Sequence, residues 1–326
     1  MSTPGVASVE AVVEAGGAGT ARVMARVEER MVELVSGHGD PLARHGGETI
    51  TAGGKRLRPL LVCIAAGVPV AESDTLVRAA VAVELVHAAT LVHDDVLDGA
   101  NLRRGRPTVV AAGGRLMAVA TGDLLFSRAF AELAAGDEIE PIRALSVAAS
   151  ALAAGELMQR ADRWHPAVDQ DRYLERCRLK TGVLFRAACE LGALAGGAPT
   201  GALGSFGESI GVAFQLLDDV LDVTGPVQRT GKPRGTDLLD GTVTLPLIEA
   251  RRRDPRLALL DLRALADRER AVSVCDQIEA TGALEYARDH ALCLVADAKA
   301  ALPAWLPESQ RAALELVADG VVERYS

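Results

Sequence analysis

The sequence predicts an all-α protein that consists of a single domain of about ten or more helices. Apolar residues recur at helical spacing along most of the 326 residues, for instance in segments 76–86, 174–179 and 271–278. Apolar–polar alternation and Asn-Gly turns, which indicate strands and hairpins, are scarce. Glycines and prolines fall at intervals that suit helices of about 10–25 residues. No linker divides the chain, so we expect one domain over residues 1–326.

The elements follow from N-terminus to C-terminus. Residues 1–50 carry little pattern and are expected to form an N-terminal helical region. The first sharply defined helix is predicted from about Ser73 to Asp98, where Gly99 ends it. A later helix is predicted to end at Gly225, because Pro226 cannot continue it.

Composition limits the functional class. Hydrophobic residues make up 49% and aromatic residues 3% of the chain, so the core must consist mainly of Ala, Leu and Val. The net charge of −9 argues against nucleic-acid binding, which needs a basic face. The five cysteines show no C-x-x-C spacing and are expected to be reduced, buried thiols rather than a zinc site.

The N-terminus has no secretory signal pattern. The longest uncharged run, Leu191 to Gly207, contains six glycines and a proline, so we expect no transmembrane helix there. These features together predict a cytoplasmic protein.

The pentapeptide DDVLD occurs twice, at Asp94–Asp98 and at Asp218–Asp222. On a helix, His87, Asp94 and Asp98 share one face, as do Gln215, Asp218 and Asp222. Carboxylates four residues apart repel each other, and a helix C-terminus disfavours anions. A solvated acidic surface is the simpler explanation for one such motif. Two copies inside apolar runs favour an oxygen-only site, which suits Mg²⁺.

Basic residues complement the two acidic motifs. They gather in GGKRLRP (residues 53–59), LRRGRP (102–107) and RTGKPRG (229–235). Only Lys55, Lys180, Lys232 and Lys299 are lysines among 35 basic residues, and three of them lie beside glycine or threonine. Glycine allows the backbone to approach a phosphate closely, so these segments are candidate phosphate contacts.

The ordered set GGKRLRP, ELVHAATLVHDDVLD, RRGRPT, GD, GELMQ, KTG, FQLLDDVLD, GKPRGTDL and TLP resembles the trans-isoprenyl diphosphate synthases, also called polyprenyl synthetases. The resemblance covers a motif core of about residues 53–246. It implies an all-α bundle around a deep central cavity, usually a homodimer, with the two aspartate motifs on opposite sides of the cavity mouth. It also implies about three Mg²⁺ ions with substrate bound.

The resemblance assigns a role to each matching residue. The metal ligands would be Asp94, Asp98, Asp218 and Asp222, with Asp219 in support. The allylic diphosphate would contact Arg103, Lys180 and Lys232, and isopentenyl diphosphate would contact Lys55, Arg58, His87 and Arg104. Thr181 and Gln215 would stabilise positive charge near the reacting carbon.

The implied reaction is the condensation of isopentenyl diphosphate with an allylic diphosphate. Ala89 and Thr90, just before the first motif, would line the growing chain. Their small size, and the five-residue form of the motif, predict a long product of about C30–C50 in a cavity whose size limits the chain. Phe126, Phe130 and Met117 are candidates for its floor. Release of such an apolar product implies transient membrane contact.

Several alternatives stay open. Neighbouring helices could narrow the cavity to give a geranylgeranyl or farnesylgeranyl product. A non-catalytic subunit of a heteromeric synthase should have lost aspartates, and a class I terpene cyclase should carry a different second motif and more aromatic residues. One departure from the family pattern is Thr242, which stands where many relatives have lysine before TLP.

Overall fold

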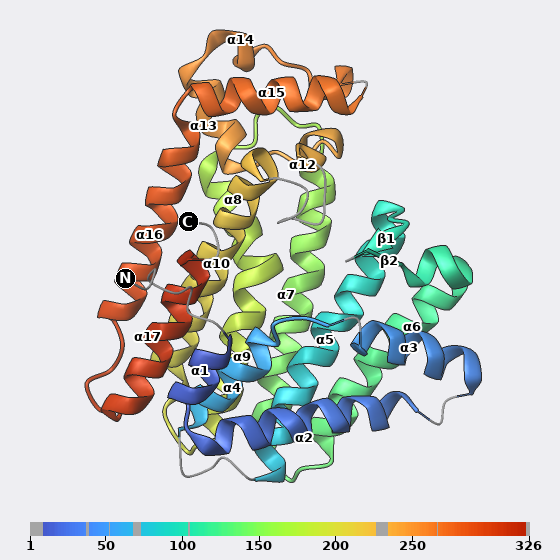
Figure 1. Ribbon diagram of the computed structural model, residues 1–326, viewed down its shortest axis with the longest axis vertical. Helices are drawn as coiled ribbons and strands as arrows, with labels where there is room; N and C mark the ends of the chain where they lie inside the picture. Colours follow the sequence, from blue (N-terminus) through green and yellow to red (C-terminus); the bar gives the residue numbers. More distant parts are fainter. Residues whose placement is uncertain are drawn as a thin grey trace, which may run out of the picture. The chain divides into compact units, whose positions relative to one another are not determined.

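A computed structural model gives the fold (Figure 1) and describes residues 9–36, 39–51, 53–67, 73–103, 105–225, 234–265 and 267–323. Within these residues the elements are helices, apart from one hairpin of two very short strands. The all-α prediction is therefore confirmed. The chain divides into two compact units, and each is described separately below. The single-domain prediction stays a prediction.

Unit 1 comprises Met1–Ala149, Leu184–Gly207 and Leu302–Val317. Its elements are α1 (Val9–Ala15), α2 (Ala18–Val35), α3 (Asp40–Thr51), α4 (Leu57–Ala66), α5 (Asp74–Asp98), β1 (Leu102–Arg103), β2 (Arg106–Pro107), α6 (Val109–Ala134), the first part of α7 (Glu140–Asp162), most of α9 (Val183–Ala195), the start of α10 (Thr200–Thr224) and most of α17 (Glu308–Glu323).

Helix α5 is the centre of unit 1 and has the predicted ends. The hydroxyl of Ser73 accepts a hydrogen bond from the backbone N–H of Leu76 at 3.1 Å, and Gly99 ends the helix with a φ of 62°. An N-cap of this kind stabilises a helix by about 1 kcal/mol. Helix α6 packs along α5 (Figure 1). Because α5 is apolar on nearly all sides, it needs neighbours all round it.

The connection between α5 and α6 is the hairpin β1–β2, which the sequence did not predict. The strands are antiparallel, and Arg103 pairs with Arg106. Gly105 makes the turn with a φ of 75°, which glycine adopts without steric strain. The hairpin brings Arg103 back towards the last turn of α5.

Helix α9 lies very close to α4 because two of its residues have no side chain. A Cβ atom on Gly192 or Gly196 would lie 2.3 Å from the carbonyl oxygen of Val62 or Ala66, respectively. This close approach positions the start of α9 beside the basic segment that precedes α4.

Unit 2 comprises Ser150–Val183, Glu208–Ala301 and Ala318–Ser326. Besides parts of α7, α10 and α17, it contains α8 (Gln170–Cys177), the π-helical turn η2 (Arg178–Gly182), α12 (Thr236–Leu239), α13 (Leu245–Arg253), α14 (Pro255–Ala258), the 3₁₀ turn η3 (Leu262–Ala264), α15 (Arg268–Ala280) and α16 (Ala283–Ala300). Helix α10 ends at Thr224, directly before Gly225, as predicted.

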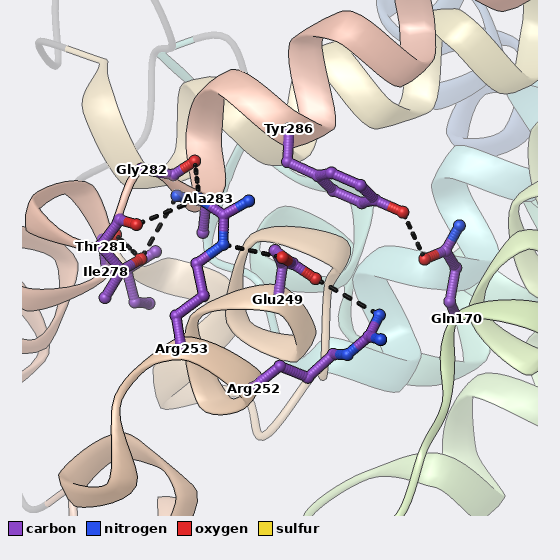
Figure 2. Close-up of polar contacts among 9 residues, drawn as sticks. All are labelled: Gln170, Glu249, Arg252, Arg253, Ile278, Thr281, Gly282, Ala283 and Tyr286. Atoms are coloured by element: carbon purple, nitrogen blue, oxygen red, sulfur yellow. Dashed lines mark hydrogen bonds and ion pairs between the residues drawn. The ribbon is translucent and has the colours of Figure 1, made fainter.

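Polar contacts within and between α8, α13 and α16 hold this part of unit 2 together (Figure 2). Nε of Arg253 donates to Glu249 at 2.7 Å, and Nη1 of Arg253 donates to the carbonyl oxygen of Gly282 at 2.6 Å. The hydroxyl of Tyr286 on α16 donates to Gln170 at 2.9 Å. The bond from Arg253 thus links α13 to the residue that directly precedes α16.

By length and composition alone, α5 and α6 could cross a membrane. The apolar window of α5 is 72% buried, as in the core helix of a soluble protein, whereas that of α6 is only 28% buried. Helix α6 therefore leaves apolar side chains uncovered, among them Leu116 at 84% exposure. An uncovered apolar helix face in a folded chain favours a binding surface.

Four of the five thiols are buried as predicted, namely Cys63, Cys177, Cys189 and Cys275. The prediction was wrong for Cys293, which is exposed on α16. Helical spacing places this residue on the outer side of an amphipathic helix, away from the buried row that includes Ala291 and Val295.

Candidate active site

The first aspartate motif occupies the last turns of α5. His87 and Asp94 are half-buried and Asp98 is exposed, whereas the intervening Val92 and Asp95 are buried. The predicted metal ligands therefore lie on the more open side of the helix. They are not shielded within the core, so hydrated ions can reach them.

Asp95, the second residue of the motif, faces a protein partner. It is 4% exposed, and its Oδ1 accepts from Nε of Arg103 at 2.9 Å and from Nη2 at 2.7 Å. Charge-assisted contacts of this kind are about twice as strong as neutral ones. The structure thus joins the first motif to a residue predicted to bind the allylic diphosphate.

The GGKRLRP segment presents Lys55 exposed and Arg58 partly buried. The guanidinium of Arg58 stacks on the ring of Phe185 at 4.7 Å, and its Nε is buried with no hydrogen-bond partner among the described residues. Burial lowers the pKa of Arg58 to about 10, although the charge of Glu84 opposes this shift. A buried donor without a partner costs free energy, and an anionic ligand would satisfy it.

Arg56, between these two residues, has a structural role. It donates to Glu28 on α2 and, at 3.0 Å, to the buried Glu84 on α5. Its left-handed backbone, with a φ of 46°, starts α4. This contact holds the basic segment against α5, and no motif in the sequence predicted it.

His93 precedes the first motif and is fitted against Gly122 on α6. The His93 ring stacks on Phe126 with centroids 6.0 Å apart, and Nε2 lies 3.4 Å from Asp123. A Cβ on Gly122 would lie 2.2 Å from that same Nε2. The GD pair (Gly122-Asp123) therefore makes room for the histidine and contacts it, which the sequence alone did not reveal.

The two residues predicted to set chain length differ in burial. Ala89 is fully buried, whereas Thr90 is half-buried and donates its hydroxyl to the carbonyl oxygen of His87 at 2.8 Å. Thr90 lies one turn before Asp94 and shares its more open side of α5. Their roles in chain length stay predictions.

In unit 2, Lys180 lies on the π-helical turn η2. Its Nζ is 2.6 Å from Oε2 of Glu156 and donates to Gln159 at 3.0 Å. Both partners belong to the GELMQ segment of α7, whose role the sequence did not specify. Single π-turns are frequent at functional sites, and here the turn carries Lys180, which contacts α7.

The second aspartate motif is connected to the KTG segment by a chain of hydrogen bonds. Thr181 donates to Oε1 of Gln215 at 2.7 Å, and Nε2 of Gln215 donates to Asp219 at 2.8 Å. The buried Tyr173 donates to the other oxygen of Asp219 at 2.7 Å. Burial raises the pKa of Asp219, and the charge of Asp237 raises it further.

The outer residues of this motif are less buried. Asp218 is exposed, and Asp222 is half-buried. Oδ2 of Asp222 accepts from the backbone N–H of Asp237 at 3.2 Å, which ties the motif to the start of α12. Tyr173 is a residue that the sequence analysis missed, because a buried tyrosine 46 positions away carries no pattern.

The donor set fits Mg²⁺. The outer side chains of both motifs offer only carboxylate oxygens, which hard cations prefer. In the described part of the chain, no group of three His, Cys, Asp or Glu side chains could hold a metal. An open pair of carboxylates suits an ion that keeps its waters and shares its ligands with substrate phosphates. Two predicted site residues, Arg104 and Lys232, lie outside the described residues.

The described residues form an all-helical protein in which two long helices each carry an aspartate-rich motif near their C-terminal end. The family model for polyprenyl synthetases matches residues 41–280. The chain belongs to this family and is an enzyme, a prenyltransferase of the polyprenyl diphosphate synthase type.

Three relatives show the range of the similarity. The chain is 42% identical over 233 residues to heptaprenyl diphosphate synthase component 2 of Geobacillus stearothermophilus, covering 70% of this chain and 72% of the relative. It is 35% identical over 284 residues to geranylgeranyl diphosphate synthase of Methanosarcina mazei, covering 84% and 87%. A polyprenyl synthase structure from Caulobacter crescentus CB15, complexed with calcium and isoprenyl diphosphate, matches with a TM-score of 0.88 and 36% identity over 99% of this chain and 100% of that one.

Proposed function

We propose that this prenyltransferase is Mg²⁺-dependent and condenses isopentenyl diphosphate with an allylic diphosphate to give a long product of about C30–C50, within a cavity that limits chain length. The repeated arrangement of the two DDVLD motifs carries the proposal. In each, the outer carboxylates are more open and the second one is buried and hydrogen-bonded. This pattern supports a motif that offers its outer oxygens to cations.

The metal ligands in this proposal are Asp94, Asp98, Asp218 and Asp222. Bound Mg²⁺ would neutralise charge on the diphosphate and so lower the barrier to its departure. The calcium in the related Caulobacter complex supports a divalent cation in this family. The outer carboxylates repel each other along the helix, so a cation would also relieve that repulsion.

The allylic diphosphate is proposed to contact Arg103, Lys180 and Lys232, and isopentenyl diphosphate to contact Lys55, Arg58, His87 and Arg104. The buried Nε of Arg58, which has no hydrogen-bond partner among the described residues, supports an anion at that position. As the carbon–oxygen bond of the allylic diphosphate breaks, its electron pair leaves with the diphosphate. The isopentenyl double bond then attacks the allylic cation, and a proton passes to the released diphosphate.

Thr181 and Gln215 are proposed to stabilise the cation through oxygen atoms. The hydroxyl hydrogen of Thr181 is donated to Gln215, so the lone pairs of the hydroxyl oxygen can face positive charge. Fixed dipoles aimed at developing charge lower a barrier without having to reorganise during the reaction.

A long product is proposed because Ala89 and Thr90 are small. The relative named for a heptaprenyl product supports this proposal, and the relative named for a geranylgeranyl product supports its shorter alternative. Purified protein would be incubated with Mg²⁺, isopentenyl diphosphate and, separately, dimethylallyl, geranyl, farnesyl and geranylgeranyl diphosphates. Mass spectrometry would give the product lengths. Hexaprenyl or longer products are expected, and a stop at geranylgeranyl diphosphate would contradict the long-chain proposal.

We also propose a cytoplasmic homodimer that touches membranes only for product release. The uncovered apolar side chains of α6, including Leu116 and Val119, support pairing with a second copy. Burial of such a face is the main driving force of stable association. Sedimentation at micromolar concentration should give a dimer, and Leu116→Glu should shift it towards monomer.

A second candidate is a subunit that needs a different partner chain, because the first of the relatives above is named a component 2. The intact aspartates fit the catalytic subunit of such a pair. Product formation by the purified chain alone would rule this candidate out. No product from a folded chain with any primer would favour it.

A further inference from the structure

The second aspartate of the first motif, Asp95, points away from the outer carboxylates. Consecutive side chains on a helix differ by about 100° in direction, so Asp94 and Asp95 cannot serve the same face. Asp95 is 4% exposed, whereas Asp98 is exposed. Burying an ionised carboxylate is costly unless it is paired and hydrogen-bonded, and Arg103 supplies that pairing.

The contact between Asp95 and Arg103 fixes the plane of the guanidinium. Nε and Nη2 both donate to Oδ1, at 2.9 Å and 2.7 Å. One edge of the guanidinium is therefore occupied by the carboxylate. Nη1 forms no hydrogen bond or ion pair with any residue that the structure describes, and the side chain keeps 31% exposure. The free edge of a planar fork held in this way is suited to two phosphate oxygens.

The hairpin alone would not hold Arg103 in this orientation. Arg103 and Arg106 are directly opposite on β1 and β2, and like charges so placed repel each other. The carboxylate of Asp95 offsets the charge of Arg103 and draws it towards α5. Thr108 closes the loop by donating its backbone N–H to Asn101 at 3.1 Å.

The second motif repeats the same division of roles within its own unit. Asp219, its second aspartate, is 5% exposed and accepts hydrogen bonds from Tyr173 and Gln215. In both motifs the second carboxylate thus binds protein side chains, while the first and last remain more open. Two independent occurrences argue that the buried aspartate is part of how the motif works.

We propose that Asp95 is a positioning residue that orients Arg103 for the allylic diphosphate and does not itself bind metal. This inference rests on the proposed function. Asp95 should therefore affect only the allylic substrate. Its carboxylate contacts Arg103 and has no hydrogen bond or ion pair with the described residues of the GGKRLRP segment, which is assigned to isopentenyl diphosphate. The loss of the carboxylate charge should therefore affect the two substrates unequally.

The test is a double-mutant cycle with Asp95→Asn, Arg103→Gln and both together. Steady-state kinetics would give kcat and KM for farnesyl and isopentenyl diphosphates, and calorimetry would give the affinity for farnesyl diphosphate with Mg²⁺. Asp95→Asn should raise KM for farnesyl diphosphate about tenfold, as expected when a charged hydrogen bond is lost. KM for isopentenyl diphosphate should not change. The double variant should be no worse than Arg103→Gln, because the aspartate acts through the arginine.

Asp74→Asn is the matched control. Asp74 also lies on α5 and pairs with an arginine, Arg26, but this pair is exposed at the other end of the helix. The control should leave both KM values unchanged. If Asp95→Asn fails to fold, Arg103→Lys serves in its place, since a lysine cannot make the two-donor contact. It should raise KM for farnesyl diphosphate selectively.

The inference would be overturned if the KM increases of the two single variants multiply in the double variant. It would also be overturned if Asp95→Asn raised both KM values equally. A shift in the Mg²⁺ requirement with Asp95→Asn would overturn it too, since that would make Asp95 a metal ligand. If the wild type is active and the effects of the two substitutions multiply, the inference about Asp95 is wrong but the proposed function stands. If the wild type neither binds farnesyl diphosphate nor condenses it with isopentenyl diphosphate, the proposed function is contradicted as well.

Discussion

The hydroxyl of Thr181 donates a 2.7 Å hydrogen bond to Oε1 of Gln215, which unites the KTG segment with the second aspartate motif. The orientation of the amide is determined by its other end, because Nε2 must donate to the carboxylate of Asp219 at 2.8 Å. The oxygen end of Gln215 therefore faces Thr181. Sequence spacing alone could place these residues on facing helices but could not orient the amide.

Gln215→Leu should abolish this arrangement while keeping the volume of the side chain. We expect kcat to fall by about 100-fold, the size of effect seen when one aligned dipole is removed from a reacting centre. Stability should fall by about 1–3 kcal/mol because Asp219 loses a hydrogen bond while buried. Gln277→Leu on α15 is the control, since among the described residues the Gln277 side chain hydrogen-bonds only to Ser273 of the same helix. A kcat near that of the wild type would remove Gln215 from the site.

Asp94→Asn should leave the fold intact and reduce turnover by about 100-fold or more, because a metal ligand supplies several kcal/mol of charge stabilisation. The half-saturating Mg²⁺ concentration should rise. Titration of activity with Mg²⁺ would measure both effects. Asp297→Asn, at an exposed position on α16, is the control. An unchanged Mg²⁺ response would contradict the assignment of Asp94 as a ligand.

Bulk at Thr90 should shorten the product. Thr90→Phe extends an aromatic ring from the more open side of α5, so the chain should stop several isoprene units earlier with little loss of stability. Ala89→Tyr should also shorten it, but Ala89 is fully buried, and overpacking costs about 1–3 kcal/mol. Product mass spectrometry and thermal unfolding would separate the two effects. Ala300→Tyr, exposed on α16, is the control for bulk. Wild-type product lengths in both variants would show that neither Ala89 nor Thr90 limits the length of the product.

The sequence predicted much of the backbone because its signals are local. Helix α5 begins after Ser73 and ends at Gly99 as expected, since capping residues act within one turn. The repeated aspartates, the lysine of KTG and Gln215 were found for the same reason, because their spacing or family pattern is visible in short segments.

The remaining contacts are not local. Glu84 binds Arg56 across 28 residues, and Tyr173 binds Asp219 across 46. The periodicity of the sequence does not predict which aspartate of a motif is buried. The burial of Asp95 and Asp219 could therefore be seen only in the structure. Phe126, a candidate for the cavity floor, stacks on His93, a contact between two helices that the sequence did not indicate.

Gly122→Ala should be strongly disruptive because the added Cβ would lie 2.2 Å from Nε2 of His93. The histidine must move, and it directly precedes Asp94. We expect lower thermal stability together with a lower kcat. His93→Ala in the same chain should restore part of the stability by vacating the space. Gly201→Ala is the control, since apart from the adjoining backbone of its own helix no described atom lies within 4 Å of the added Cβ, and it should be neutral or slightly stabilising. A Gly122→Ala protein with normal stability would contradict the close packing of His93 against Gly122.

Buried thiols predict how stability depends on alkaline pH. Burial raises the pKa of Cys63 and of Cys189 to about 12. An unfolded thiol loses its proton near pH 9, whereas these native thiols keep theirs to about pH 12. The native state therefore binds more protons over this range, so the free energy of unfolding should fall as pH rises from about 9 to about 12.

Urea unfolding at a series of pH values would measure this slope, and Cys189→Ala should make it shallower. Cys293→Ala should not, because Cys293 is exposed. The same burial protects the thiols from reagents. A thiol-reactive chromophore at about pH 8 should titrate Cys293 in the native protein and all five cysteines after denaturation. Rapid reaction of Cys189 in the native protein would show that the middle of α9 opens more readily than its packing implies.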